Sequence, residues 1–370
     1  MSLTKKIILI IFSIIAGTTV AITTYGMVLY SRAQQTIEQT YNPIATPAQE
    51  IERTRRIQAT EPISILLMGI DTGDVGRVEG FAGRSTTMMV VTLNPTKQET
   101  TIVSIARDSL NNFAFEGFLD IPGVGLVNTF ADKLNHTFAY GGARLTRDTI
   151  NQLLDIEINY YMAINMGGLG ALVDAVGGIQ IDNQMGEFYV NDSPKFNITV
   201  QPGLQIMDGN TALAYTRMRK FDPDGDIGRQ RRQREVLEEI VNRLLSVNTV
   251  ANYQRIFDAL ADNMQTDISF ANMMNLVEGY HTAGNTINYF QLAGMDHSIN
   301  GIYYQLLLRE NILEITNILR VQKGLPEVAF INPNIITFEN QTGLLAPFTF
   351  DIRTGRPLEM EEEIPEVHYE

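Results

Sequence analysis

A dense group of arginines stands out in an acidic chain. The stretch "RMRKFDPDGDIGRQRRQRE", residues 217–235, holds seven of the 28 Lys and Arg residues, although the formal net charge is −14. After the turn signal "DPDG" (222–225), a helical pattern runs from about Gly228 to Ser246, with Asp226 in the N-cap position. Cations in the first turns of a helix face the positive end of its dipole, which costs about 0.3–1 kcal/mol for each charge. A bound anion would reverse this cost, so the stretch predicts a local anion site.

Helical spacing divides these arginines between two faces. Residues three and four apart are neighbours on a helix, which puts Arg229 and Gln233 on one stripe with the apolar Val236 and Ile240. We therefore expect Arg229 and Gln233 to point inward. A buried arginine needs a partner, because an unpaired buried charge costs several kcal/mol. The helix alone leaves two partners open, a structural carboxylate or a ligand phosphate.

The other face of this helix carries Arg231 and Arg234, with Glu238 one turn after Arg234. An arginine and a glutamate at this spacing are typical of a solvated surface, so we expect these two arginines to need no ligand. Just upstream, "YTRMRK" is interpreted as a strand, which would project Arg217 and Arg219 to the same face. Convergence of these groups with Arg229 and Gln233 favours an anion as the partner.

A second polar cluster borders three apolar runs of strand length at residues 63–70, 86–93 and 100–106. Asp71 follows the first run, Arg84 and Ser85 precede the second, and Arg107 and Asp108 follow the third. Each could be an ordinary turn residue, but strand ends are where α/β sheets place their ligands. Arginine forks match phosphate oxygens, and an aspartate can hold Mg²⁺ against them. The combination predicts a pyrophosphate site, where catalysis rests mainly on positioning and charge neutralisation.

The elements that must position these residues alternate between strand and helix. The three apolar runs are rich in β-branched residues and indicate strands buried on both faces. Helical spacing at 142–155 and 167–178 surrounds a predicted strand at 160–166, and a further strand, "IQI", follows. We also expect long amphipathic helices over "VLEEIVNRLL" and over 303–324, the second ended by Gly324. This alternation predicts an α/β/α layered fold around a mixed sheet.

The N-terminal region has the features of a membrane anchor. Residues 7–31 contain no charged residue and could cross a hydrocarbon core of about 30 Å as a helix. A cleavable signal peptide is the alternative, but the apolar run is long and no A-x-A site closes it. Lys5 and Lys6 would keep residues 1–6 in the cytoplasm and place the rest outside, as a single-pass protein of the cell membrane. We expect an extracellular linker at 32–60, one domain at 61–345 and a disordered acidic tail at 346–370.

Composition excludes several classes of function. The negative charge argues against a nucleic-acid partner, because phosphate backbones attract basic surfaces. No cysteine occurs, so no thiolate can act as nucleophile or metal ligand. The HExxH, GxSxG and GxxxxGK[ST] patterns are missing, which removes the zinc-protease, serine-hydrolase and P-loop interpretations.

An ordered series of motifs runs over residues 61–245. The series reads "LLMGID", "GRST", "SIARD", "DKLNHTFAYGG", "INMGGLGALVDAVGGI", "GNTALAYTRMRK" and "GDIGRQRRQRE". This series resembles the LytR-CpsA-Psr family of Gram-positive cell-envelope proteins. The resemblance implies transfer of a secondary glycopolymer, such as teichoic acid or capsular polysaccharide, from a polyprenyl pyrophosphate carrier to peptidoglycan. It also implies Mg²⁺, with Mn²⁺ as an alternative, held by Asp71, and catalytic roles for Asp71, Arg84 and Arg107. The residues implied in pyrophosphate binding are Arg84, Arg107, Arg217, Arg219, Arg229 and Gln233.

Two positions depart from the family pattern. Thr86 stands where the family usually has an aspartate, and a hydroxyl is a weaker Mg²⁺ ligand than a carboxylate. Ala106 stands where proline is common. Thr86 keeps open a second function, a non-catalytic protein that binds lipid-linked polymer and regulates envelope assembly. A DNA-binding regulator would need a cytoplasmic domain, which Lys5 and Lys6 argue against.

Overall fold

The computed structural model describes residues 26–359, apart from residue 29 and residues 36–37, 73–82, 194–195, 219–220, 224, 246–255, 257–259 and 261–262. Most of the predicted membrane segment, residues 7–25, lies outside the described residues. Over the part of the chain that is described, no helix is long and apolar enough to cross a membrane. The signal-anchor therefore stays a prediction.

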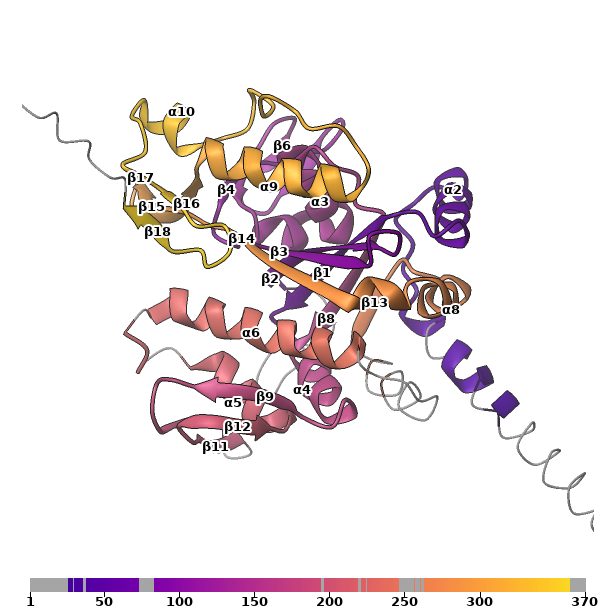
Figure 1. The fold of residues 1–370 in the computed structure, drawn as a ribbon. Helices are drawn as coiled ribbons and strands as arrows, with labels where there is room; N and C mark the ends of the chain where they lie inside the picture. Colours follow the sequence, from indigo (N-terminus) through magenta and orange to yellow (C-terminus); the bar gives the residue numbers. More distant parts are fainter. Residues whose placement is uncertain are drawn as a thin grey trace, which may run out of the picture.

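A six-stranded mixed sheet forms the centre of the molecule (Figure 1). β1 pairs in parallel with β8, and β3 pairs in parallel with β14, whereas the other neighbours are antiparallel. The three apolar runs at 63–70, 86–93 and 100–106 are central strands, as predicted, and nearly all their residues are buried. In spatial order the strands are β13 (Met264–Thr266), β8 (Tyr160–Asn165), β1 (Ile63–Ile70), β2 (Ser85–Asn94), β3 (Glu99–Ile105) and β14 (Thr286–Leu292).

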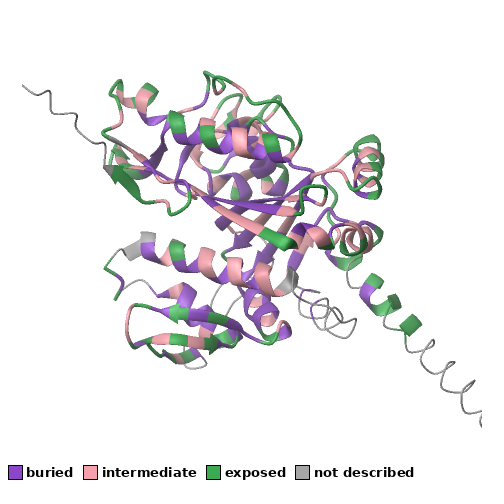
Figure 2. Cartoon of the chain, in the orientation of Figure 1, coloured by how far each residue is buried: buried purple, intermediate pink, exposed green. Residues whose placement is uncertain are grey.

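Helices cover both faces of the sheet, which explains the near-continuous apolar strands (Figures 1 and 2). On one face lie α3 (His136–Leu154) and α9 (Arg309–Gln322), whose leucines and isoleucines pack on the strands. On the other face lie α4 (Met166–Ala175), α5 (Gly209–Arg217) and α6 (Gly225–Leu245). The prediction of an α/β/α layered fold is confirmed.

Short elements surround this core as two-stranded pairs and small helices. The pairs are β4 (Leu110–Asn112) with β7 (Ala131–Lys133), β5 (Leu119–Ile121) with β6 (Gly125–Val127), β9 (Ile179–Asn183) with β12 (Gly203–Met207), β10 (Phe188–Ser193) with β11 (Phe196–Val200), β15 (Gly294–Ile299) with β16 (Ile302–Leu307), and β17 (Phe348–Phe350) with β18 (Pro357–Glu359). The helices are α2 (Pro47–Gln58), α8 (Phe270–Gly279), η1 (His281–Asn285) and α10 (Phe338–Thr342).

The expected single helix over 303–324 is wrong in its first part. β16 occupies its beginning and pairs with β15, and α9 starts only at Arg309. Leu306 and Leu307 are fully buried in this strand, so their apolar character fits either element and the periodicity alone could not decide. The predicted end is confirmed, since Gly324 adopts a φ of 72° just after the helix.

Both predicted flanking segments contribute to the folded body. Within the expected linker, α2 begins with a capping box between Thr46 and Gln49. Arg53 of α2 is buried and bonds Asp267 at 2.9 Å, so the folded domain starts before residue 61. Within the expected disordered tail, β17 and β18 form a hairpin whose Phe350 is buried. Residues 360–370 lie outside the described residues.

Candidate anion-binding site

One edge of the central sheet brings together the residues that border its strands. β1, β3, β8 and β14 all end at this edge, and β2 begins there. The backbone N–H of Asp71 donates to the carbonyl of Arg84 at 3.0 Å, which fixes the two residues side by side. Asp71 and Arg84 are exposed, whereas Arg107, after β3, is half-buried. The predicted meeting of these residues at the sheet edge is confirmed, and their roles stay predictions.

Thr86 occupies an irregular position at this edge. Gly69 pairs with Thr87 and Ile70 pairs with Ser85, so Thr86 is the extra residue of a β-bulge. Its hydroxyl donates to the carbonyl of Gly69 at 3.2 Å, close to Asp71 in the chain. The hydroxyl oxygen therefore keeps lone pairs at the end of β1 but brings no charge.

The backbone of Arg107 is held by the segment before α3. The N–H of Asn135 donates to the carbonyl of Arg107 at 2.9 Å. Asp108 lies 3.3 Å from Arg107 and 3.3 Å from Lys133, so two cations share one buried carboxylate. In the neighbouring segment, Nδ1 of His136 lies 2.7 Å from the Asp132 carboxylate. Burial raises the pKa of Asp132, but the bond to His136 outweighs it together with the other nearby donors, so the pKa of this carboxyl is lower than usual. Arg107 thus projects from a braced loop.

Helix α6 presents its predicted stripe to the core. It begins at Gly225, three residues before the predicted start, so Asp226 lies inside the first turn and the N-cap prediction is wrong. Val236 and Ile240 are fully buried, as expected, and Gln233 is buried beside them. The amide of Gln233 donates to the carbonyl of Thr216 at 3.4 Å. Arg229 is half-buried one turn before Gln233.

Arg217 is placed differently from the prediction. It is the last residue of α5 and not part of a strand, so strand alternation does not relate it to Arg219. The guanidinium of Arg217 lies over the ring of Phe196, 4.2 Å from its centroid, and burial lowers the pKa of Arg217. Arg219 lies outside the described residues.

Arg232, the remaining arginine at the start of α6, meets a structural carboxylate. Arg232 is fully buried and forms an ion pair with Asp222. Its Nε also donates to the carbonyl of Tyr215 at 2.8 Å, and a further bond goes to the carbonyl of Met218. Gly228 is necessary here, because a Cβ at that position would overlap the Asp222 carboxylate. Arg232 therefore stabilises the connection between α5 and α6.

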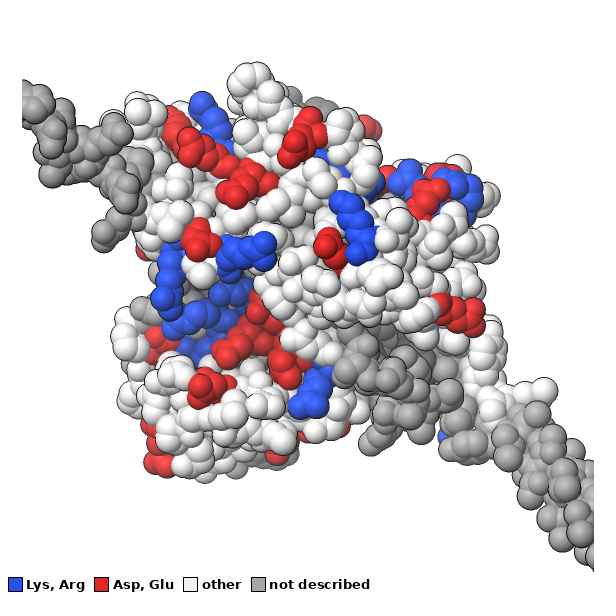
Figure 3. Space-filling model, in the orientation of Figure 1, with Lys and Arg blue, Asp and Glu red and all other residues white. Residues whose placement is uncertain are grey.

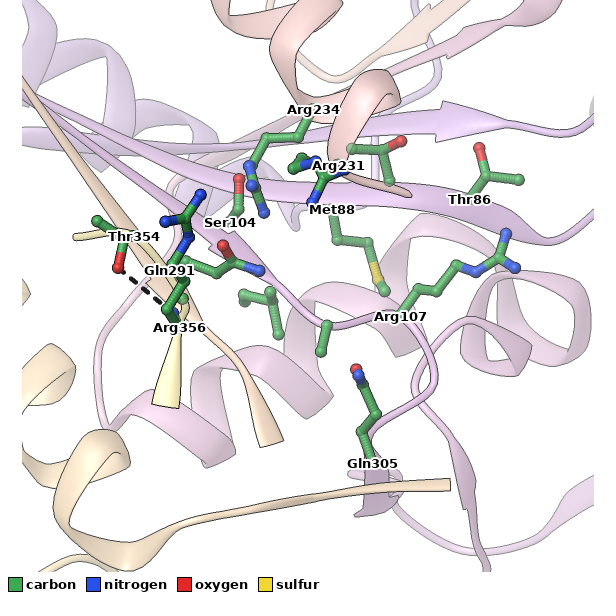
Figure 4. Close-up of a pocket in the computed structure, with 14 residues that line it drawn as sticks. Thr86, Met88, Ser104, Arg107, Arg231, Arg234, Gln291, Gln305, Thr354 and Arg356 are labelled. Carbon is green, nitrogen blue, oxygen red and sulfur yellow. Dashed lines mark hydrogen bonds between the residues drawn. The ribbon is translucent and has the colours of Figure 1, made fainter. Parts of the chain in front are cut away.

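A pocket of about 400 Å³ opens where the sheet edge, α6 and the C-terminal hairpin meet (Figure 4). In the surface view, Lys and Arg side chains gather in a hollow over this region (Figure 3). Four arginines line the pocket, and its described lining contains no acidic residue. These arginines are Arg107, Arg231, Arg234 and Arg356, and the other lining residues include Thr86, Met88, Ser104, Gln291, Gln305 and Thr354.

Arg231 is exposed, as expected for the solvated face, and the expectation that Arg231 and Arg234 need no ligand stays a prediction. Both side chains line the pocket, and Arg234 is partly covered rather than solvated. Burial lowers the pKa of Arg234, although Glu238 lies 3.7 Å away as the predicted neighbour one turn on. Arg356 was missed because it falls in a segment whose acidic composition predicts a disordered tail. Of the predicted pyrophosphate residues, Arg107 lines the pocket, whereas Arg84, Arg217, Arg229 and Gln233 lie outside its lining.

Comparison with known proteins identifies the family. The model of the LytR_cpsA_psr family matches residues 27–321. The chain belongs to this family. A teichoic acid transferase of Enterococcus faecalis, named polyisoprenyl-teichoic acid–peptidoglycan teichoic acid transferase TagU, is 42% identical over 326 residues, which cover 87% of this chain and 99% of the relative. Biofilm regulatory protein A of Streptococcus mutans is 36% identical, over 88% of this chain and 78% of the relative.

Solved structures of family members have the same fold. Protein gbs0355 from Streptococcus agalactiae matches with a TM-score of 0.68 and 36% identity, over 78% of this chain and 97% of that chain. TagT bound to LIIa-WTA matches with a TM-score of 0.55 and 27% identity, over 72% of this chain and 93% of that chain. The resemblance of the motifs to the LytR-CpsA-Psr family is thus confirmed. The family match ends at residue 321, before the hairpin that carries Arg356.

Proposed function

We propose that this protein attaches a secondary cell-wall glycopolymer, such as teichoic acid or capsular polysaccharide, to peptidoglycan. The donor is the polymer on a polyprenyl pyrophosphate carrier. The observation that carries this proposal is the pocket at the sheet edge, lined by four arginines and by no described acidic residue. The name of the Enterococcus faecalis relative, a transferase of teichoic acid to peptidoglycan, supports the same reaction.

The chemistry follows from charge. A sugar hydroxyl of peptidoglycan attacks the phosphorus that bears the glycopolymer, a new P–O bond forms, and the bond to the bridging oxygen breaks. Polyprenyl phosphate leaves with the bridging oxygen, and the hydroxyl proton passes to a base or to water. Arg107 binds the pyrophosphate oxygens and stabilises the charge that accumulates as the bond breaks, and Arg84 assists from the neighbouring strand. The other residues assigned to pyrophosphate binding are Arg217, Arg219, Arg229 and Gln233.

The described residues fit a divalent cation only in company with the substrate. Among them no group of three or more His, Cys, Asp or Glu could hold a metal ion. Mg²⁺ commonly takes one or two carboxylates and completes its shell with substrate phosphates and water. Asp71, exposed at the end of β1, provides one carboxylate. The hydroxyl of Thr86, which donates to the carbonyl of Gly69, provides a neutral oxygen at the same strand end. Bound Mg²⁺, or Mn²⁺, would neutralise phosphate charge, with Asp71 as its ligand from this chain.

The protein acts outside the cell, held by the apolar segment at residues 7–31. Lys5 and Lys6 before that segment support a cytoplasmic N-terminus. Protease treatment of intact cells tests this topology. Digestion of the folded domain is expected, and protection of the domain would contradict the extracellular assignment.

A transfer assay tests the activity. The purified full-length protein is incubated with a polyprenyl-pyrophosphate saccharide, a peptidoglycan oligomer and Mg²⁺, and the expected products are the coupled oligomer and polyprenyl phosphate. The second candidate is a non-catalytic regulator that binds the lipid-linked polymer, which Thr86 and the name of the Streptococcus mutans relative favour. Binding of the donor without product would support the regulator and contradict the transferase.

A further inference from the structure

The arginines of the pocket lie at two separate ends. Arg107 extends toward Thr86, whereas Arg231, Arg234 and Arg356 direct their guanidinium groups into the other end (Figure 4). Arg231 and Arg234 come from α6, and Arg356 comes from the turn between β17 and β18. Two segments that are remote in the sequence thus supply the cationic surface at this end.

From this arrangement we propose that Arg231, Arg234 and Arg356 form a second anion subsite, which binds a phosphate of the glycopolymer itself. The proposal rests on the proposed function and specifies its substrate. If the carrier pyrophosphate lies at Arg107, an anion farther along the pocket belongs to the next part of the donor. The preferred donor is then a polymer with a phosphodiester near its reducing end, and not a neutral polysaccharide.

The charge balance of the pocket favours such an anion. Three guanidinium groups that share a pocket repel one another, and the described lining of the pocket contains no acidic residue. Arg234 forms an ion pair with Glu238 at 3.7 Å, and burial raises the pKa of Glu238 to about 7. At neutral pH this carboxylate therefore carries only part of a charge. No ion pair in the described part of the chain involves Arg356.

An unused hydrogen-bond donor points to the same ligand. Ser104 of β3 lines the pocket and is only 6% exposed, and its Oγ has no hydrogen-bond partner among the described residues. A buried hydroxyl without a partner is unfavourable, because it has lost its hydrogen bonds to water. A phosphate oxygen would accept its proton. The amide of Gln291 lines the same end and offers further donors.

The hairpin that carries Arg356 is fixed against the sheet. The N–H of Gln291 donates to the carbonyl of Ile352 at 2.5 Å. Gly355, with a φ of 66°, lies so close to Gln291 that a Cβ would overlap its side chain. Arg356 is therefore presented by a positioned turn. Arg353 of the same hairpin lies instead over the ring of Phe290, at 4.4 Å, and lines a different pocket, which makes it a matched control.

The test compares two donors with the full-length protein. One donor is a polyprenyl-pyrophosphate disaccharide, and the other is the same molecule extended by one glycerol phosphate. We expect the wild type to have a kcat/KM roughly tenfold higher for the phosphate-bearing donor. This is the gain that one additional charge-assisted hydrogen bond would give. Arg356→Gln should abolish this ratio, Arg356→Lys should retain part of it, and Arg353→Gln should leave it unchanged.

Several outcomes overturn the subsite. Equal kcat/KM for both donors in the wild type contradicts it, and so does an Arg356→Gln variant that slows both donors by the same factor. If neither donor is turned over, the proposed function fails, and direct binding decides the subsite separately. A glycerol phosphate trimer should then bind the wild type roughly tenfold more tightly than Arg356→Gln; equal affinities would refute the subsite on its own.

Discussion

Two sets of arginines in this protein are partnered in opposite ways. Arg53 and Arg232 are buried, and each meets an aspartate, Asp267 at 2.9 Å and Asp222 respectively. The arginines of the pocket face a common cavity whose described lining holds no carboxylate. Arg53 joins α2 to the residue that follows β13, and Arg232 joins α6 to α5. The second set leaves an excess of positive charge where the strands end.

This difference separates structural from ligand-binding arginines without reference to sequence motifs. A buried structural charge requires a buried partner of opposite sign, because the cost of an unpaired ion exceeds what packing returns. A charge that serves a ligand must remain accessible, and the carboxylates beside the pocket arginines, Asp108 at 3.3 Å from Arg107 and Glu238 at 3.7 Å from Arg234, stand outside the pocket lining. Variants of these arginines, of their carboxylate partners and of the helix that carries Arg53 test this difference.

The largest expected effect is on stability. Asp267→Ala leaves the Arg53 guanidinium buried without its carboxylate and removes the acceptor of the Tyr161 N–H, so the free energy of unfolding should fall by about 3–5 kcal/mol. Urea denaturation measures this loss. Glu61→Ala breaks the exposed pair with Arg55 and should cost no more than about 1 kcal/mol. Equal losses in the two variants would contradict the structural role of Arg53.

The second effect is on activity. Arg107→Ala should lower the transfer rate by about 10²–10³-fold, since it removes a donor to the developing phosphate charge. Stability should change little, because Asp108 keeps Lys133 at 3.3 Å. Release of polyprenyl phosphate measures the rate, and Arg144→Ala, an exposed residue of α3, is the control. An unchanged rate would refute the role of Arg107.

The third effect concerns Glu238, the carboxylate behind the pocket. Burial raises its pKa to about 7, opposed by Arg234 and reinforced by Glu235. Between about pH 4.5 and pH 7 the folded state then holds a proton that the unfolded state has lost, so stability falls as pH rises, by roughly 1–3 kcal/mol. Glu238→Gln should flatten this slope in urea denaturation at pH 5, 6 and 8. A slope that persists in the variant would assign it to another group.

The smallest effect concerns the helix that carries Arg53. Thr46→Ala removes the capping box of α2 and should lower the free energy of unfolding by about 1 kcal/mol. Ile51→Ala, on the same helix but 73% exposed, should change it by less than about 0.5 kcal/mol. If both changes are neutral in urea denaturation, α2 does not fold cooperatively with the domain.

The sequence predicted the sheet well because its strands carry a strong signal. β1 was predicted at its observed bounds, since a strand buried on both faces is a continuous apolar run between polar residues. The same contrast located Asp71 and Arg107 at the strand ends. β16 was predicted as helix because its apolar residues continue into α9 without a break. Local periodicity carries no information about pairing with β15.

The candidate site was only partly predictable for a related reason. The stripe of Gln233, Val236 and Ile240 correctly identified the core face of α6. The opposite face of α6 was expected to be wet; Arg231 is exposed, but Arg234 is half-buried, and both line a pocket with the sheet edge and the C-terminal hairpin. What lies opposite a helix face depends on segments more than 100 residues away, which spacing within the helix does not encode.

The C-terminal hairpin gives the pocket a place in the order of synthesis. The six strands of the central sheet end with β14 at Leu292, whereas Ile352 and Arg356 follow later in the chain. All residues of the central sheet are therefore synthesised before these two. The anion subsite is thus completed last, and a nascent or truncated chain has the α/β core without its full set of pocket arginines.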